Sequence, residues 1–517
     1  MNDMFYRHKI TDRSYLADES KMTGAADDII FPMDENELRG ALIYLNNRSI
    51  PTTISAMRTG VCGGAVPKGG DIISLTNLAG ITGVGRDDRG FYIRVLPCTT
   101  LDDIDFQLSI GLHDDVAELT PGALSELRSS EHRYFYPVDP TEMGGSIGGN
   151  IATNASGPRT FRYGPTREWV KSLKVMFADG TYTWIERGSV HAVDGRISFF
   201  AGRNYYSFQL PDYTFNDGVK NSAGPRISPD MDLIDLFIGS EGIFAVITEA
   251  DLRLVPRHPL MSSIAFLPDD DSALAAARDL KSSDLDLEFI EYMDGASLDL
   301  LRQVASEDPV FLKIPPIPAK AGSALFFDMP LQDYSGSFGE LSGILSSHGC
   351  EPEDIWCGHE ADDRRRMREM RHSIPRTIFE YVASLKEEMP KIHKMGTDMS
   401  VPDDRADEMM AFYRDSLEAA GLEYVMFGHI ANNHPHVEII LKSMDDFEKA
   451  QRVYEEFACK AVELGGSPSA EHGIGKIKTG YMEMLYGKKG VESLMRIKSI
   501  LDPNWILCPG NLVGGRP

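Results

Sequence analysis

Four of the chain's thirteen histidines fall within one short stretch, residues 428–475. His429, His434 and His436 lie in a single string, and His472 directly follows Glu471. Imidazole and carboxylate groups are the usual ligands of a catalytic divalent metal, and imidazole is the usual proton acceptor at neutral pH. If these residues meet in space, the sequence predicts an enzyme whose chemistry takes place there.

The spacing of the first three histidines is typical of a β-hairpin. Residues 424–427 and 437–441 are rich in strand-forming side chains, and the residues between them favour a turn. We expect His429 and His436 to lie at facing strand ends, where cross-strand Cβ atoms are about 4.5–5.5 Å apart. Such a pair can share a metal, with Glu471 as third ligand and positions left open for a substrate. His434 falls in the predicted turn and is expected to point elsewhere. The alternative is that these histidines are hydrogen-bonded pocket residues without a metal.

Three glycine-rich stretches precede the histidines, at residues 58–67, 140–157 and 239–242. Glycine lets backbone N–H groups approach phosphate oxygens closely and adopt positive φ angles. None of the three matches the dinucleotide pattern G-x-G-x-x-G or the P-loop pattern G-x-x-x-x-G-K-[ST]. Because each lies beside a strand-like or helix-like segment, together they predict a large phosphate-bearing cofactor.

The surrounding segments predict a mixed chain of helices and strands. Residues 34–48 should form a helix, because Asp34 can cap it and Glu37 occupies the reciprocal capping-box position. The strand-like segments are residues 50–54, 71–75, 244–254 and a hairpin at 173–184. The segments typical of amphipathic helices are residues 269–281 and 403–421. Since the glycine loops disappear at this point, we place a domain boundary near Arg257.

The overall composition is that of a water-soluble, acidic protein. A chain of 517 residues predicts two or three domains. With 52 Lys+Arg against 78 Asp+Glu the net charge is −26, which repels phosphate backbones and argues against a nucleic-acid partner. This charge does not prevent a small acid from binding in a locally basic pocket.

The six cysteines form no C-x-x-C pair, which argues against an iron–sulfur cluster, a structural zinc or a disulfide framework. Residues 1–15 are polar, so we expect no secretory signal, and no apolar run approaches membrane-spanning length. We therefore expect a cytoplasmic protein, for which any membrane association would be peripheral and through a partner.

Five motifs carry a resemblance to a known family when they are taken together. They are residues 63–67 (GGAVP), 148–155 (GGNIATNA), 239–242 (GSEG), 471–475 (EHGIG) and 501–503 (LDP). In this combination the chain resembles flavoproteins with the vanillyl-alcohol-oxidase type of FAD fold, in particular the D-lactate/glycolate/D-2-hydroxyglutarate dehydrogenase branch. The resemblance covers residues 31–512, nearly the whole chain.

The resemblance implies an α+β fold with three segments. Residues 1–257 would form a two-subdomain, PCMH-type FAD-binding domain. Residues 258–464 would form an α+β cap domain with an antiparallel sheet, and residues 465–517 would return to the FAD domain.

In that family the glycine-rich loops hold FAD, which we expect to be non-covalent here. The residues implied to contact the cofactor are Arg58, Thr59, Gly60, Val61, Cys62, Gly63, Gly64, Pro140, Gly144, Gly145, Ser146, Gly148, Gly149, Asn154, Gly157, Glu241, Gly242, Ile247 and Asn511. Met57 and Arg58 depart from the family, which often has glycines there. Cys508 replaces the usual asparagine close to Asn511.

The resemblance also implies roles for the clustered histidines. His429, His436 and Glu471 match the family's metal ligands, with the two histidines also lining the substrate site, and His472 matches the proposed catalytic base. Zn, Mn and Fe all accept this ligand set, so the sequence does not choose among these divalent metals.

Two cations match family residues that bind the substrate carboxylate. Arg371 lies in the string MRHSIP, and Lys394 begins the pattern Lys-x-x-x-Asp-x-x-Val-Pro. An arginine can bind a carboxylate through two parallel hydrogen bonds. The neighbouring residues 364–366 are expected to form a solvated helix face. Glu438 stands where relatives often have asparagine, a change that alters the expected substrate pocket.

The implied activity is FAD-dependent oxidation of a small D-2-hydroxy acid, such as D-lactate, to the 2-oxo acid. A metal on the substrate oxygens would acidify the hydroxyl, and a neutral imidazole would take its proton. The electrons would pass to a separate acceptor: an electron-transfer flavoprotein, an iron–sulfur subunit, a cytochrome, a quinone or oxygen. A homodimer is one arrangement that the resemblance leaves open.

Two alternatives remain at this point. The first is a metal-free flavin oxidase of a phenolic or other alcohol on the same fold. The second is a flavin-bearing electron-transfer subunit whose own substrate site is idle.

Overall fold

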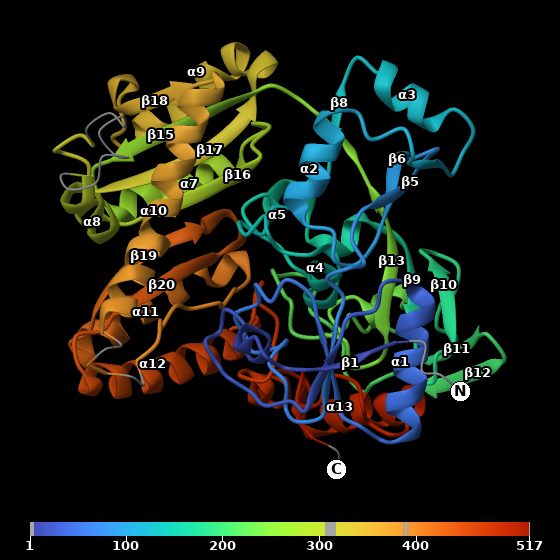
Figure 1. Cartoon of the computed structure of the whole chain (residues 1–517). Helices are drawn as coiled ribbons and strands as arrows, with labels where there is room; N and C mark the ends of the chain where they lie inside the picture. Colours follow the sequence, from blue (N-terminus) through green and yellow to red (C-terminus); the bar gives the residue numbers. More distant parts are fainter. Residues whose placement is uncertain (1–4, 306–316, 386–387, 390–391, 516–517) are drawn as a thin grey trace.

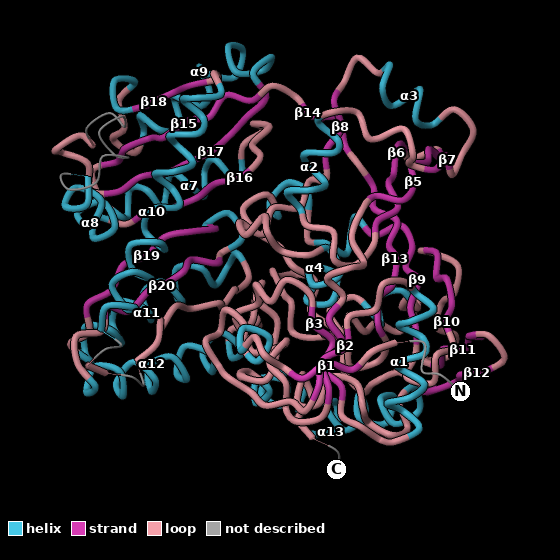
Figure 2. The backbone as a smooth tube through the Cα atoms, in the orientation of Figure 1, coloured by secondary structure: helices cyan, strands magenta, loops and turns pink. Residues whose placement is uncertain are grey.

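The computed structural model describes residues 5–305, 317–385, 388–389 and 392–515. In Figure 1 the first half of the chain, blue to green, lies on the right and at the bottom, and residues 260–440, yellow to orange, lie on the left. The last helix, α13 (Thr479–Leu501), runs along the bottom next to the first half of the chain. Figure 2 shows that much of the region between these parts consists of loops.

The first sheet has four strands in the order β1–β2–β4–β3. They are β1 (Arg7–Lys9), β2 (Asp28–Ile30), β3 (Thr52–Ser55) and β4 (Asp71–Ser74), and β4 is parallel to both β2 and β3. Helix α1 (Glu35–Asn47) connects β2 to β3. As predicted, its N-cap is Asp34, whose carboxylate accepts hydrogen bonds from the N–H groups of Asn36 and Glu37. The extended segments predicted beside the first glycine loop are therefore β3 and β4.

The second sheet has six strands in the order β10–β9–β13–β6–β5–β7. They are β5 (Ile81–Asp87), β6 (Gly90–Val95), β7 (Ala117–Glu118), β9 (Val170–Met176), β10 (Tyr182–Glu186) and β13 (Val246–Arg253). The predicted hairpin is the antiparallel pair β9–β10, and Gly180 takes a φ of +78° in its turn.

Short elements connect these two sheets. The helices are α2 (Leu101–Ser109), α3 (Ala123–Ser129), α4 (Ile147–Thr153), α5 (Thr160–Tyr163) and α6 (Ile234–Phe237). Two small antiparallel pairs join β8 (Arg133–Phe135) to β14 (Val255–Arg257) and β11 (Arg196–Ala201) to β12 (Asn204–Gln209). The second glycine-rich stretch forms α4 and the loops on either side of it.

The third sheet has six strands in the order β18–β15–β17–β16–β19–β20, and every neighbouring pair is antiparallel. The strands are β15 (Leu260–Leu267), β16 (Phe289–Met293), β17 (Ser323–Pro330), β18 (Ile355–Gly358), β19 (Glu423–His429) and β20 (His434–Ile440). The expected α+β class and the antiparallel sheet of the later half are confirmed.

Helices cover both faces of this third sheet. They are α7 (Asp270–Ser282), α8 (Gly295–Ala305), α9 (Leu331–Ser347), α10 (Ala361–Leu385) and α11 (Ala406–Ala420). Successive side chains of a strand point to opposite faces, so Leu325 and Phe327 of β17 join one core cluster with α7 and α9, whereas Phe326 joins another with α8 and α10. The two predicted amphipathic helices are α7 and α11, the latter preceded by a 3-10 turn at Asp403–Arg405.

The long helix α12 (Met444–Glu463) follows the third sheet and packs on α11 and α13. Lys498 of α13 donates hydrogen bonds to the backbone carbonyls of Ile243 and Leu507, which ties the end of the chain to its first half. Within the described parts of the chain, we find no helix with the length and hydropathy needed to cross a lipid bilayer.

Candidate active site

The clustered histidines lie on the hairpin formed by β19 and β20. The predicted hairpin is confirmed, but its register differs from the expected one, because His429 pairs with His434 and His436 pairs with Phe427. The turn is a single 3-10 segment, Ile430–Asn432, closed by Asn433 at a φ of +50°. Since Asn433 takes this left-handed conformation, the turn ends there and β20 begins at His434. His434, two residues before His436, is therefore the partner of His429.

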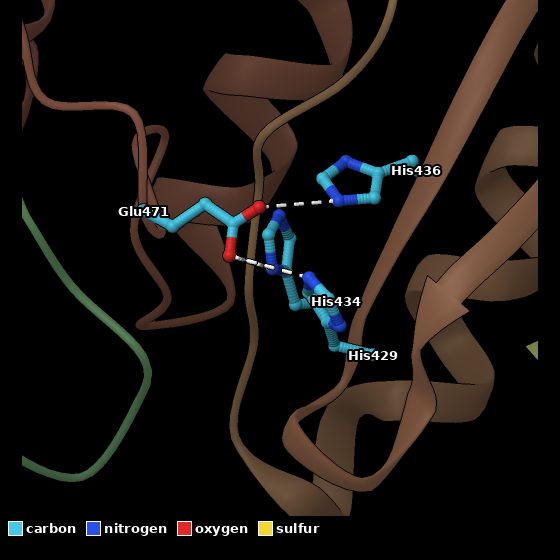
Figure 3. A group of neighbouring side chains, drawn as sticks. All are labelled: His429, His434, His436 and Glu471. Carbon is cyan, nitrogen blue, oxygen red and sulfur yellow. Dashed lines mark ion pairs between the residues drawn. The ribbon is translucent and has the colours of Figure 1, made fainter. Parts of the chain in front are cut away.

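All three histidines of the hairpin face Glu471 (Figure 3). His434 and His436 are two residues apart on one strand and therefore share a face. One ligand atom from each of His429, His434, His436 and Glu471 lies within 4.8 Å of the others. The expectation that His434 points elsewhere is wrong, because it is fully buried within this group.

The rings of His429 and His436 are held by their Nδ1 atoms. His429 Nδ1 lies 2.5 Å from Glu291 Oε1, and His436 Nδ1 lies 3.0 Å from the carbonyl oxygen of Thr397. The other nitrogen of each ring, Nε2, faces Glu471 at 3.3 and 3.2 Å. A histidine that ligates a metal usually donates its second N–H to a carboxylate or a backbone carbonyl, as these two are placed to do.

The donor atoms of the cluster are suited to a divalent cation. Although burial opposes it, Lys220 and His429 hold the pKa of Glu471 well below its usual range, so the carboxylate is ionised. His434 Nδ1 is buried without a hydrogen-bond partner among the described residues and lies 3.9 Å from Glu471. A buried imidazole nitrogen without a partner is costly unless another group binds it. The donor set of imidazole nitrogens and one carboxylate suits Zn, Mn or Fe.

His472 lies between two carboxylates at the edge of this cluster. Its Nδ1 is 3.4 Å from Asp398 Oδ2, and its Nε2 is 3.5 Å from Glu471 Oε1. Burial lowers the pKa of His472 to about 4, against the opposing effects of Asp398 and Glu471. The imidazole is therefore neutral near pH 7 and able to accept a proton.

Asp398 positions the segment that carries Glu471 and His472. Its carboxylate accepts hydrogen bonds from the backbone N–H groups of both residues, at 3.0 and 3.2 Å. It also accepts from Lys478 Nζ at 2.6 Å and from Ser469 Oγ at 3.0 Å. With four hydrogen-bond donors around its carboxylate and no exposed surface, Asp398 fixes the segment from several directions.

A cavity of about 430 Å³ lies in the first half of the molecule, among the glycine-rich loops. The expected cofactor residues that line it are Arg58, Thr59, Gly60, Val61, Cys62, Gly64, Pro140, Ser146, Gly148, Gly149, Glu241, Gly242, Ile247 and Asn511. Arg58 takes a φ of +59° and stacks on Tyr15, its guanidinium carbon 4.2 Å from the ring centroid. This contact holds the loop at a position where glycine would be the unstrained residue.

The other expected cofactor residues lie just behind the cavity wall: Gly63, Gly144, Gly145, Asn154 and Gly157. Asn154 ends α4 at a φ of +50°, and its Oδ1 accepts a hydrogen bond from the N–H of Arg167. A Cβ on Gly157 would stand 1.7 Å from the carbonyl oxygen of Asp139, so this glycine permits close backbone packing. In this structure both residues shape the wall and do not face the space.

A second, larger cavity of about 830 Å³ lies against the third sheet, and it meets the first one. The residues that line both cavities are Thr59, Val61, Cys62, Pro140, Thr141, Glu142, Glu471 and His472. Glu471 of the cluster and His472 therefore stand at the junction between the two cavities.

The two expected substrate cations both line the second cavity but differ in their partners. Arg371, on α10, has a buried Nη1 without a hydrogen-bond partner among the described residues, and its guanidinium stacks on Phe289 at 4.9 Å. Lys394 Nζ lies 2.6 Å from Glu438 Oε1 and is thus already paired. Of the neighbouring arginines, Arg365 and Arg366 pair with Asp362 as expected. The expectation is wrong for Arg364, which turns towards the third sheet and donates a hydrogen bond to Ser262 Oγ.

Three charged residues contact the cluster although no motif in the sequence predicts that they do. Lys220 Nζ lies 2.6 Å from Glu471 Oε2, Glu291 orients His429, and Asp398 orients His472. Glu291 offered a signal, since it interrupts the apolar run of β16, and Asp398 belongs to the pattern that begins at Lys394. Lys220 lies in a loop without a recognisable pattern.

Comparison with known proteins assigns the chain to a family. The model described as "FAD linked oxidases, C-terminal domain" matches residues 260–512, and the model described as "FAD binding domain" matches residues 126–186. The chain is an FAD-linked oxidoreductase. The resemblance stated from its motifs is thereby confirmed, and FAD is the cofactor that the first half of this oxidoreductase binds.

Curated relatives match this oxidoreductase over most of its length. Glycolate oxidase subunit GlcD of Bacillus subtilis is 26% identical over 500 residues, which cover 94% of this chain and 88% of the relative. D-lactate dehydrogenase of Archaeoglobus fulgidus is 26% identical over 491 residues, covering 94% and 91%. D-2-hydroxyglutarate dehydrogenase of Xanthomonas citri pv. viticola is 25% identical over 505 residues, covering 94% and 88%.

Solved structures support the fold of the oxidoreductase. An alkyldihydroxyacetonephosphate synthase aligns with a TM-score of 0.60 and 12% sequence identity, covering 95% of this chain and 77% of that one. At this identity the likeness concerns the fold alone.

Proposed function

We propose that this oxidoreductase converts a D-2-hydroxy acid, of which D-lactate is a small example, to the 2-oxo acid. In this proposal His429, His436 and Glu471 hold a divalent metal and His472 is the catalytic base. The observation that carries the proposal is the junction of the two cavities at Glu471 and His472. A substrate bound there would face both the flavin and the cluster.

The names of the relatives support the same class of substrate. The three relatives described above are a glycolate oxidase subunit, a D-lactate dehydrogenase and a D-2-hydroxyglutarate dehydrogenase. Glycolate, lactate and 2-hydroxyglutarate share a hydroxyl group next to a carboxylate. That shared part of the substrate is what a metal, a base and a cation at one junction are suited to bind.

In this proposal, His472 and Asp398 handle the proton of the substrate's hydroxyl group. When bound, FAD would take the hydride from the substrate's Cα, and the metal would make the hydroxyl more acidic. His472 presents Nε2 towards Glu471, and thus towards the place where the hydroxyl would lie. Asp398 faces Nδ1 of the same ring and stabilises the imidazolium that forms when Nε2 takes the proton.

Arg371 is the cation best placed for the substrate carboxylate. Its buried Nη1 has no hydrogen-bond partner among the described residues, so a carboxylate in the cavity would satisfy a donor that is otherwise costly to bury. Arg371 belongs to α10 of the cap, whereas Glu471 and His472 come from the loop before α13. The carboxylate and the hydroxyl of the substrate would therefore be held by different parts of the chain.

We also propose that the reduced flavin passes its electrons to a separate acceptor. The candidate acceptors are an electron-transfer flavoprotein, an iron–sulfur subunit, a cytochrome, a quinone or oxygen. One relative, 24% identical over 500 residues, is named D-lactate dehydrogenase [cytochrome], mitochondrial, of Arabidopsis thaliana, which makes a cytochrome one reasonable choice.

Anaerobic mixing of the oxidised holoenzyme with paired D- and L-2-hydroxy acids tests the function. We expect the flavin absorbance to bleach with one or more D-acids and to stay unchanged with their L-enantiomers. Bleaching by phenolic or simple alcohols, with none by hydroxy acids, would replace the proposal with a metal-free alcohol oxidase. A flavin that no substrate bleaches, but that a reduced electron carrier reduces, would indicate an electron-transfer subunit with an idle site.

A further inference from the structure

A buried carboxylate lines the second cavity, on the same strand as His434 and His436 of the cluster. Glu438 of β20 lines this cavity, and only 3% of its side chain is exposed. Its Oε1 pairs with Lys394 Nζ at 2.6 Å, whereas its Oε2 is buried without a hydrogen-bond partner in the described part of the chain. A buried carboxylate oxygen without a partner is a strong acceptor that a ligand can satisfy.

The backbone holds this carboxylate in place. Glu438 forms an isolated antiparallel bridge with Gly396, and an ideal Cβ on Gly396 would stand 2.3 Å from Glu438 Oε1. Only the missing side chain of Gly396 leaves room for the carboxylate, which lies flat against that backbone. The bridge to Gly396 and the ion pair with Lys394 therefore both hold the carboxylate at this place in the cavity.

The pairing changes what the cavity can recognise. Lys394 would otherwise be a free cation beside the substrate, but Glu438 already balances its charge. A second carboxylate on the substrate would gain little from Lys394, because Glu438 already balances the lysine's charge. It would also have to approach the negatively charged Oε2 of Glu438, which is unfavourable. A neutral hydrogen-bond donor would instead satisfy Oε2 without disturbing the pair.

The strand fixes how far this group lies from the reacting end of the substrate. Glu438 is two residues beyond His436 on the same face of β20, a separation of about 7 Å. A substrate whose 2-hydroxyl lies at the cluster would therefore reach Glu438 with a side chain of about three carbons. The cavity, at about 830 Å³, has ample room for such a chain, and Phe326, Phe379 and Phe427 give it apolar walls.

We propose that Glu438 is a specificity-determining residue, which selects 2-hydroxy acids with a hydroxyl near the end of the side chain and disfavours those with a second carboxylate. This inference rests on the proposed function and names its substrate class more narrowly. It assigns to Lys394 a structural pairing with Glu438 in place of direct binding of the substrate carboxylate, which is left to Arg371.

The test compares three five-carbon D-acids that differ only at C5. They are 2-hydroxypentanoate with a methyl group, 2,5-dihydroxypentanoate with a hydroxyl group, and 2-hydroxyglutarate with a carboxylate. The second-order rate constant of anaerobic flavin reduction is measured for each with the holoenzyme. We expect the dihydroxy acid to exceed the methyl compound about tenfold, as a hydrogen bond to a charged acceptor allows, and 2-hydroxyglutarate to be the poorest of the three.

Two variants separate the charge of Glu438 from its role as acceptor. Glu438→Gln keeps the shape and frees Lys394, so 2-hydroxyglutarate should gain about tenfold or more relative to 2-hydroxypentanoate. Glu438→Leu removes the acceptor, so the advantage of the dihydroxy acid should disappear. Because each readout is a ratio of rate constants for two substrates with the same protein sample, a variant that is only partly active gives the same ratio as a fully active one.

Glu455→Gln is the matched control. Glu455 is an exposed residue that lines the same cavity and accepts a hydrogen bond from Tyr481. This substitution removes the same charge as Glu438→Gln and should leave the substrate ratios unchanged. Ratios that stay within about twofold of the wild type in both Glu438 variants, or a wild-type preference for 2-hydroxyglutarate, would overturn the inference. If none of the three acids bleaches the wild-type flavin, the result contradicts the proposed function itself, before the role of Glu438 is tested.

Discussion

His472 lies between Asp398 and Glu471, and each carboxylate faces a different nitrogen of its ring. Burial keeps the imidazole neutral near pH 7, which leaves it able to take a proton. Asp398 orients the ring through its Nδ1 atom, so that Nε2 points towards Glu471 and the cluster. The ring is thus held in one orientation by contacts that do not depend on the substrate.

We predict that His472→Asn retains its yellow FAD but is reduced by D-2-hydroxy acids about 10²–10⁴-fold more slowly, because asparagine takes up no proton at neutral pH. Stopped-flow absorbance of the flavin measures the rate. His348→Asn, at a surface residue paired with Asp279, is the control and should match the wild type. A rate in His472→Asn close to that of the control would remove the residue from the role of base.

The roles of single residues could be predicted from the sequence only where a string of residues carried them. Glu471 and His472 stand in one short motif and the three hairpin histidines in another, and the structure brings the two motifs together. Glu291 and Lys220 approach the cluster from segments far away in the chain, so no local spacing could place them there. Contacts of this kind depend on the tertiary fold.

At the scale of elements, the β19–β20 hairpin shows both the strength and the limit of a pattern. The two strand-like runs predicted the hairpin correctly. Its register depends on the conformation of one residue, Asn433, whose positive φ starts β20 at His434. Turn residues such as Asn allow several turn types, so the sequence did not decide the register.

Helix α8 begins after Asp294, a buried residue whose ionised form destabilises the folded protein. Asp294 Oδ1 accepts a hydrogen bond from the N–H of Ser297, and burial raises the pKa of Asp294 to about 7. In the unfolded chain this carboxyl ionises near its usual pKa of about 3.9. The folded protein therefore loses stability as the pH rises from about 4 to about 7, because the carboxyl ionises in the unfolded chain while it stays protonated in the folded one.

We predict that Asp294→Asn becomes more stable relative to the wild type as the pH is raised. Asparagine preserves the cap at the start of the helix but never ionises. The difference in unfolding free energy should shift towards the variant by up to about 1.4 kcal/mol for each pH unit between 5 and 7, and then level off. Chemical denaturation of both proteins at pH 5, 7 and 8 measures it. A difference that does not change with pH would show that Asp294 is not strained by its charge.

At the scale of the whole molecule, the site exists only where three parts of the chain meet. The first half supplies the glycine-lined cavity, the antiparallel sheet supplies the histidines, and the last segment supplies Glu471 and His472. The motifs predicted each of these parts separately. That the cavities join at Glu471 and His472 could not be predicted from spacing, because it follows from how the sheets pack.

The central claim is that a metal held at this junction is needed for hydroxy-acid oxidation. Its most direct test is anaerobic flavin reduction by D-lactate or the best D-acid found, before and after a chelator has removed divalent metal and after metal is returned. We predict a fall of about a hundredfold or more on removal and recovery on return of Zn, Mn or Fe. His429→Ala combined with His436→Ala should keep FAD and stay slow whatever metal is added. A full reduction rate in enzyme shown to contain no metal would contradict the claim.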